Sequence, residues 1–333
     1  MNFALAHLSD PHLPIPAGAL RPLTQLAGKR SLAYLGWLRK RAGAIQPEAL
    51  LADLAAHGPD HVAVTGDLTN LALPVEFAAA RDWLARIGPP TRVTAIPGNH
   101  DATVPVPWER GLGLWRPWMA GDSAGENRPT RFPFLRRRGP VALIGLSSAV
   151  PTPPGSAEGW LGAEQLARLP PLLEEAGRDG LFRVVLVHHP PLLGRGGWRR
   201  ALRDRDALRG VLARSGAELV LHGHHHSTLR AEVEGLAGPI PVFGAPLALR
   251  TGREPAGWHL HRIARDGAAG WRLDTVVRAW DAAAGVFRTA RVWTNRISSG
   301  GGRSRGFSPG GSVKRTASKS GKPRVVGASL EKP

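Results

Sequence analysis

Two kinds of apolar pattern alternate along the chain. Short apolar or β-branched runs bounded by turn residues predict strands at 2–8, 61–65, 92–96, 141–146, 183–187 and 218–221. Apolar residues at helical spacing predict helices over 30–41, 48–57, 75–87, 162–175 and 204–215. Further strands are expected around Val242, over 258–263 and over 271–280. The repeated order of strand, loop and helix predicts an α/β layered fold with a partly parallel sheet.

Side chains that can ligate a metal follow five of these strands. In α/β sheets the ligand site lies beyond the carboxyl ends of the strands, so we expect the five clusters to meet at one edge. Taken alone, each cluster is typical of a surface polar pair, a turn or an incidental metal-binding patch. The clusters are Asp10 with His12, Asp67, Asn99 with His100 and Asp101, His188 with His189, and His222 with His224 and His226.

The donor atoms of this set are carboxylate, amide and imidazole groups. That mixture suits Mn, Fe or Zn better than a thiolate site or a pure Ca or Mg site. The number of donors exceeds the needs of one ion. Two divalent ions that share a bridging carboxylate would use them all, so a dinuclear centre is predicted.

The ordered motifs resemble those of the calcineurin-like metallophosphoesterase superfamily, over roughly residues 2–280. The resemblance implies a four-layer αββα sandwich, in which two mixed β-sheets are flanked by helices. It also implies that Asp10, His12 and His226 hold a first metal, that Asn99, His188 and His224 hold a second, and that Asp67 bridges both. The motifs are Asp10-x-His12, Gly66-Asp67-x-x-Asn70, Gly98-Asn99-His100-Asp101, His188-His189-Pro190-Pro191 and Gly223-His224-x-His226.

The resemblance further implies hydrolysis of a phosphate ester by attack of a hydroxide that bridges two metals, with Mn or Fe favoured and Zn an alternative. His100 would protonate the leaving group and Asp101 would orient His100, while Asn70 would shape its loop. The favoured substrate is a phosphodiester such as a cyclic nucleotide or a small nucleotide or lipid derivative. A nuclease of the same superfamily and a non-catalytic phosphate-binding module are the alternatives.

Neighbouring histidines leave two ambiguities. His188 and His189 are adjacent, so one of them faces the metals, and the motif favours His188, with His189 as a neighbour or substrate contact. The other ambiguity lies in His222-Gly223-His224-His225-His226, where the motif favours His224 and His226 as ligands. His222 alternates with these two and is the fallback ligand, whereas His225 is expected to point away.

The charge of the chain is uneven. The net charge is +18, and residues 287–333 carry eleven Lys or Arg against the single acid Glu331, which leaves +8 on residues 1–286. A domain over 1–286 and a disordered Gly/Ser/Lys/Arg-rich tail over 287–333 are therefore predicted. The tail could contact nucleic acid or anionic lipid, or it could be a solvated extension.

Other basic segments have competing interpretations. Residues 28–41 could cap an anionic substrate, touch a membrane surface, or form an ordinary helix with a solvated basic face. Arg136-Arg137-Arg138 is expected to be a solvated turn, and the Arg-rich stretch 195–205 is a candidate for phosphate contact.

Cysteine is absent, which excludes disulfides and thiolate ligands. We see no signal peptide and no run of about 18 apolar residues that would span a membrane, so a cytoplasmic location is expected. The oligomeric state is not indicated by the sequence.

Overall fold

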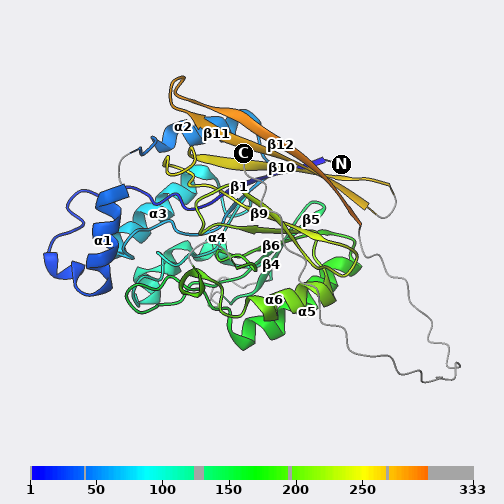
Figure 1. The fold of residues 1–333 in the computed structure, drawn as a ribbon, viewed down its shortest axis with the longest axis horizontal. Coiled ribbons are helices and arrows are strands. Elements are labelled where there is room, and N and C mark those ends of the chain that lie inside the picture. Colours follow the sequence, from blue (N-terminus) through cyan, green and yellow to red (C-terminus); the bar gives the residue numbers. More distant parts are fainter. Residues whose placement is uncertain (1, 41–42, 124–130, 194–196, 268–269, 299–333) are drawn as a thin grey trace, which may run out of the picture. The chain divides into compact units, whose positions relative to one another are not determined.

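The computed structural model describes residues 2–40, 43–123, 131–193, 197–267 and 270–298, and the ribbon is drawn in Figure 1. The helices are α1 (Lys29–Lys40), α2 (Pro47–His57), α3 (Pro74–Ile87), α4 (Arg116–Met119), α5 (Gly162–Arg178) and α6 (Arg205–Ser215). The strands are β1 (Asn2–Leu8), β2 (His61–Val64), β3 (Val93–Ala95), β4 (Phe134–Arg138), β5 (Val141–Gly145), β6 (Phe182–Leu186), β7 (Leu219–His222), β8 (Leu229–Val233), β9 (Ile240–Gly244), β10 (Gly257–Arg265), β11 (Gly270–Asp281) and β12 (Val286–Ser298).

The first sheet has the strand order β12-β11-β10-β1-β2-β3. β1, β2 and β3 are parallel because helices connect them, with α2 between β1 and β2 and α3 between β2 and β3. β10 pairs antiparallel with β1, and β11 and β12 continue as antiparallel neighbours joined by short turns.

The second sheet has the strand order β4-β5-β6-β7-β9-β8. β5, β6, β7 and β9 are parallel, while the edge strands β4 and β8 are antiparallel to their neighbours. α5 links β5 to β6 and α6 links β6 to β7, so the parallel strands end at a common edge.

The two sheets share one hydrophobic core. Alternate residues of each strand point to opposite faces, and side chains from both sheets meet between them. Phe182 of β6 and Trp271 of β11, for example, lie 5.3 Å apart between ring centroids. A second apolar cluster joins the other face of the second sheet to α5 and α6, which lie beneath β4 and β6 in Figure 1.

The other face of the first sheet packs against α2. The indole of Trp258 on β10 donates a hydrogen bond to Asp53 of α2 at 2.9 Å, and Arg278 of β11 pairs with the same carboxylate. Figure 1 shows α2 beside β11. Two six-stranded mixed sheets flanked by helices confirm the predicted αββα sandwich.

The structure corrects the expected boundary of the basic tail. Residues 287–298 belong to β12, which pairs with β11 along its length. Phe287 and Ile297 are buried, whereas Arg288 and Arg296 form ion pairs with Asp281 and Asp266. The excess of basic residues led to the prediction of disorder, but an exposed edge strand also tolerates arginines. The rest of the predicted tail, 299–333, lies outside the described residues.

The structure also corrects the interpretation of Arg136. This residue lies within β4 and is buried, and its guanidinium donates hydrogen bonds to the carbonyls of Ala120, Pro90, Val93 and Pro117. A buried guanidinium needs that many acceptors, and only the folded chain brings them together.

Along the described residues, none of the helices combines the length and the apolarity that a bilayer crossing would demand.

Candidate metal centre

The loops that follow β1, β2, β6 and β7 are joined by backbone hydrogen bonds. Asp10 N–H donates to the Gly66 carbonyl at 3.0 Å and His12 N–H donates to the Asp67 carbonyl at 3.0 Å. Gly223 N–H donates to the His188 carbonyl at 3.1 Å. The strand ends therefore converge, as the topology predicts, and they carry the predicted ligands other than Asn99, which lies in the loop after β3.

The first group of donors contains Asp10, His12, Asp67 and His226. One donor atom from each lies within 4.8 Å of the others. His226 Nε2 is 3.1 Å from Asp10 Oδ1 and 3.4 Å from His12 Nε2, and His12 Nε2 is 3.9 Å from Asp67 Oδ2. These are the residues expected around the first metal, together with the expected bridge.

The second group contains Asn99, His188 and His224. Asn99 Oδ1 lies 2.8 Å from His224 Nδ1 and 3.2 Å from His188 Nε2. His188 Nε2 also lies 3.4 Å from Asp67 Oδ2. Asp67 therefore contacts both groups.

Backbone carbonyls orient the imidazoles of the second group. His188 Nδ1 donates to the Thr65 carbonyl at 2.6 Å, and His224 Nε2 donates to the Arg200 carbonyl at 2.9 Å. Each bond turns the other ring nitrogen toward Asn99, on the side where a metal ion would bind. Histidines that bind metals are oriented in this way.

Strained backbone is concentrated at the same positions. Among the described residues, six that are not glycine have positive φ, and five of these are candidate ligands. Such conformations cost about 1–3 kcal/mol each and persist mainly at functional sites. The five ligands are Asp10 (50°), His12 (43°), Asp67 (56°), His224 (68°) and His226 (55°).

Two motif glycines are required by close approach of the loops. A Cβ on Gly98 would clash with the Asp67 carboxylate and lie 2.7 Å from His188 Cε1. A Cβ on Gly223 would clash with Ser9 Oγ and with the Asp10 carboxylate. No other residue type leaves room for the ligands at these two places.

His100 lies beside the first group, with its ring 4.8 Å from that of His12 between centroids. Its Nδ1 donates to the Asn70 carbonyl at 2.9 Å, and its backbone N–H donates to Asp67 Oδ1 at 2.7 Å. The Asn70 carbonyl therefore orients the ring and leaves Nε2 available for proton transfer.

Asp101 has a different partner from the one that the sequence analysis expects. Its Oδ2 accepts the N–H groups of Asp67 and Gly98 at 2.9 Å each, and its Oδ1 accepts the Thr69 N–H at 2.8 Å. Asp101 thus holds the Asp67 loop, and the orienting role passes to Asn70. The amide of Asn70 donates to the Leu13 carbonyl at 2.7 Å, so that side chain shapes its loop as predicted.

The neighbouring histidines have other partners, although a ring nitrogen of His189 lies within 4.8 Å of ring nitrogens of His188 and His224. His189 contacts Ser148 Oγ at 2.8 Å through Nδ1 and the Ala157 carbonyl at 3.1 Å through Nε2, so both of its nitrogens are occupied. His222 Nδ1 contacts the Gly223 carbonyl at 2.8 Å. The structure gathers neither His222 nor His225 into a donor group, which agrees with the preference for His224 and His226.

Electrostatics in the centre follow from burial and from the paired charges. Burial disfavours ionisation of Asp67, but the imidazoles of His188 and His100 outweigh burial and hold the pKa of Asp67 well below its ordinary value. Burial also opposes protonation of His188, yet the Asp67 charge raises the pKa of His188 to about 9. Burial and the Asp67 charge raise the pKa of Asp101 to about 7.

The residues fit a pair of divalent cations. Asp10 Oδ1 is buried, and although His226 Nε2 lies 3.1 Å away it makes no aligned hydrogen bond among the described residues, while two imidazole nitrogens approach each other at 3.4 Å. A cation between such groups satisfies the carboxylate oxygen and the imidazole lone pairs together. The His/Asp cluster can therefore bind metal.

Arginine stands beside the second group. Trp198–Arg200 forms a short 3-10 turn, and the charge of Arg200 contributes to the lowered pKa of His224, for which burial is the main cause. Arg200 belongs to the Arg-rich stretch 195–205 predicted to contact phosphate, while residues 195 and 196 of that stretch lie outside the described residues.

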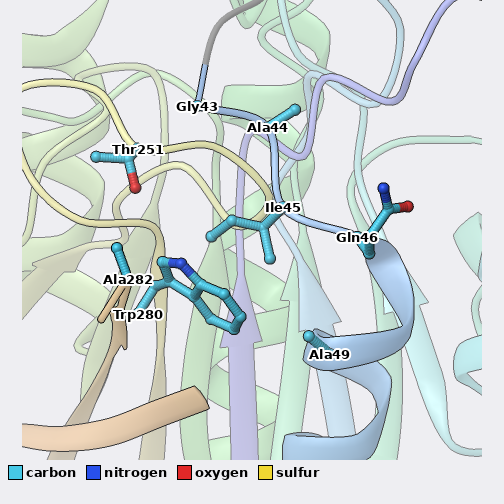
Figure 2. Close-up of a pocket in the computed structure, with 8 residues that line it drawn as sticks. All are labelled: Gly43, Ala44, Ile45, Gln46, Ala49, Thr251, Trp280 and Ala282. Atoms are coloured by element: carbon cyan, nitrogen blue, oxygen red, sulfur yellow. The ribbon is translucent and has the colours of Figure 1, made fainter. Parts of the chain in front are cut away.

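An apolar pocket lies away from the metal centre. Figure 2 shows a mostly apolar pocket of about 560 Å³ between the segment that precedes α2 and the end of β11, lined among others by Ile45, Thr251 and Trp280. Its lining contains no charged side chain, so it offers no groups for phosphate chemistry.

Sequence reasoning missed Glu76. Its Oε1 accepts the Asn70 N–H at 2.8 Å and its Oε2 accepts the N–H groups of Leu71 and Leu73 at 3.0 Å. This carboxylate closes the loop whose Asn70 carbonyl holds His100. Its position in the first turn of α3, three residues after Leu73, is the signal that could have revealed it.

Paired donor groups at the strand ends of two facing mixed sheets define a metal-dependent phosphoesterase. The chain belongs to the calcineurin-like phosphoesterase family, whose sequence profile matches residues 3–228. The protein is therefore a hydrolase that acts on phosphate esters, in a family that depends on two metal ions.

Relatives agree on this class. The chain is 26% identical over 279 residues to a "Probable cyclic nucleotide phosphodiesterase" of Synechococcus sp., covering 82% of this chain and 91% of the relative. It is 29% identical over 190 residues to the glycerophosphodiester phosphodiesterase GpdQ of Enterobacter lignolyticus, covering 56% of this chain and 57% of that one. A dimetal phosphatase from Danio rerio shares the fold, with a TM-score of 0.57 at 13% identity over 89% of this chain and 99% of that one.

Proposed function

We propose that the protein is a phosphodiesterase that hydrolyses small phosphodiesters at a dinuclear centre. The observation that carries the proposal is the position of Asp67, whose Oδ2 lies 3.4 Å from His188 Nε2 and 3.9 Å from His12 Nε2, between the two donor groups. Asp10, His12 and His226 would hold one ion, Asn99, His188 and His224 would hold the other, and Asp67 would bridge them. Mn and Fe suit this donor set best, with Zn as the alternative.

Two bound divalent ions would neutralise the phosphoryl charge and lower the pKa of the attacking water. The protein supplies the remaining groups. The His100 ring, held through Nδ1 by the Asn70 carbonyl, presents Nε2 to protonate the departing alkoxide. Arg200, beside His224, attracts the anionic ester.

The choice of a diester rests on charge and on the relatives. A diester carries a single negative charge, and the guanidinium of Arg200 beside the second group would help to balance it. Both curated relatives named above are phosphodiesterases, and one of them is named for cyclic nucleotides.

A reconstitution screen tests the proposal. Metal-free protein is loaded with Mn²⁺, Fe²⁺ or Zn²⁺ and assayed on bis-p-nitrophenyl phosphate, p-nitrophenyl phosphate, a cyclic nucleotide and DNA. We expect metal-dependent turnover of the small diesters, with at least about tenfold lower kcat/KM for the monoester.

An Asp67→Ala variant is the control for that screen, and it should lose both bound metal and turnover. Preferential cleavage of DNA would instead support a nuclease. Full metal loading without any turnover would support a binding module and overturn the proposal.

A further inference from the structure

Three histidines outside the candidate ligand set lie together in the interior. His7 is on β1, and His259 and His261 are on β10. His7 lies directly opposite His259 in the antiparallel register, and His261 lies opposite Leu5. Residues two apart in a strand share a face, so the three imidazoles project from the same face of the first sheet.

That face is the one that meets the second sheet. Phe243 of β9 lies 6.3 Å from His259 and 5.4 Å from His261 between ring centroids. All three histidines are fully buried. A ring nitrogen from each lies within 4.8 Å of a ring nitrogen of the other two.

Four of the six ring nitrogens in this group lack hydrogen-bond partners among the described residues. His7 Nδ1, His261 Nε2 and both nitrogens of His259 are buried and have no hydrogen-bond partner among the described residues. A buried polar atom left without a partner carries a free-energy cost. A single ligand contacted by all three rings would remove the cost at once.

A chain of hydroxyl groups fixes the tautomer of His7. The Thr65 hydroxyl donates to Ser9 Oγ at 2.8 Å, and the Ser9 hydroxyl donates to the Thr65 carbonyl at 3.2 Å. The Thr65 oxygen is therefore left to accept the Nε2–H of His7 at 2.9 Å. His7 Nδ1 then carries a lone pair.

A hydroxyl also holds the second ring. His261 Nδ1 lies 2.9 Å from Thr275 Oγ1, which leaves Nε2 free. Hydrogen bonds from the far nitrogen are what orient metal-binding histidines. Metals bind the neutral form of imidazole, and the full burial of His259 disfavours the charged form.

We propose that His7, His259 and His261 bind a third divalent cation of the Zn²⁺ type, which links β1 to β10. Three imidazoles form a donor set suited to zinc, and a water molecule completes the four ligands. Ligand nitrogens around a tetrahedral zinc lie roughly 3.4 Å apart, so small ring rotations close the present spacing. The ion is structural, because the site faces the interior between the sheets.

Zinc stoichiometry in matched variants tests the site. Metal-free protein is reconstituted with Zn²⁺, freed of excess metal by gel filtration, and analysed for zinc per chain. The wild-type protein should hold about one zinc more than His259→Phe, whatever the occupancy of the dinuclear centre. The control His61→Gln changes another buried histidine of the same sheet, outside the three-histidine group, and should match the wild type.

Equal zinc in the wild type and in His259→Phe would overturn the proposal. A second measurement needs no variant: anomalous diffraction at the zinc edge from wild-type crystals should give a peak within about 2.1 Å of His7, His259 and His261. A water molecule between the three rings, with no anomalous peak, would also overturn it.

Discussion

His100 is the residue whose role is defined most sharply by its contacts. The Asn70 carbonyl accepts from its Nδ1 at 2.9 Å, and its ring packs against His12 without entering either donor group. A ring that lies beside a metal site but outside its donor set is placed to transfer a proton rather than to hold a cation.

Replacement of His100 by alanine should therefore separate proton transfer from metal binding. We expect His100→Ala to retain its metal content and to lose about 10²–10⁴-fold in kcat on alkyl diesters, whose leaving groups need a proton. The loss should be much smaller on bis-p-nitrophenyl phosphate, because p-nitrophenolate departs without one. Equal rates of wild type and variant on an alkyl diester would show that His100 is not the acid.

Asp101 illustrates what a single sequence cannot provide at this scale. Its place in the motif Gly98-Asn99-His100-Asp101 identifies it as part of the site. The identity of its partners depends on how the loop after β2 meets the loop after β3. Both of its oxygens accept hydrogen bonds from N–H groups of these two loops, and these contacts are visible only in the folded chain.

At the scale of elements, the loops that follow the parallel strands are packed against one another without spare room. Gly98 lies against Asp67 and His188, and Gly223 lies against Ser9 and Asp10. The ligands hold their positive φ values because these loops surround them.

A methyl group at Gly98 should force these loops apart. We expect Gly98→Ala to lose bound metal, as measured by elemental analysis. Its free energy of unfolding, measured in urea, should be about 1–3 kcal/mol lower than that of the wild type. The matched control is Gly36→Ala in α1, where a Cβ meets no atom within 4 Å. Retention of both metals in Gly98→Ala would contradict the packing described for this loop.

Most elements could be predicted because their apolar periodicity is strong. The parallel strands β2 and β6 are buried throughout, and α3 (Pro74–Ile87) lies within one residue of the predicted bounds 75–87. The edge strands β4, β8 and β12 were missed, because edge strands carry polar and charged residues that hide the alternation. Arg136 in β4 is the extreme case, since its burial depends on carbonyls from distant segments.

At the scale of the whole molecule, buried neutral histidines link stability to pH. Burial and the nearby charges of Arg138, Arg136 and Arg92 lower the pKa of His61 to about 3. Below pH 6.5 the unfolded chain takes up a proton at this residue that the folded protein does not bind. The stabilisation is therefore complete above pH 6.5 and is lost as the pH falls toward 3.

His61→Gln should remove this one contribution. Between pH 5.5 and 4.5 the free energy of unfolding of metal-free wild type should fall by about 1.4 kcal/mol more than that of the variant. Urea unfolding at the two pH values gives the comparison. Identical slopes for the two proteins would mean that His61 is protonated in the folded state.

The arrangement of the molecule serves one chemical purpose, which is to bring donors from four separate loops to the two sides of Asp67. The most direct test is electron paramagnetic resonance of protein loaded with two equivalents of Mn²⁺. The account predicts the spectrum of an exchange-coupled pair, which Asp67→Ala abolishes. Two bound Mn²⁺ ions that give only the signal of isolated Mn²⁺ in the wild-type protein would contradict it.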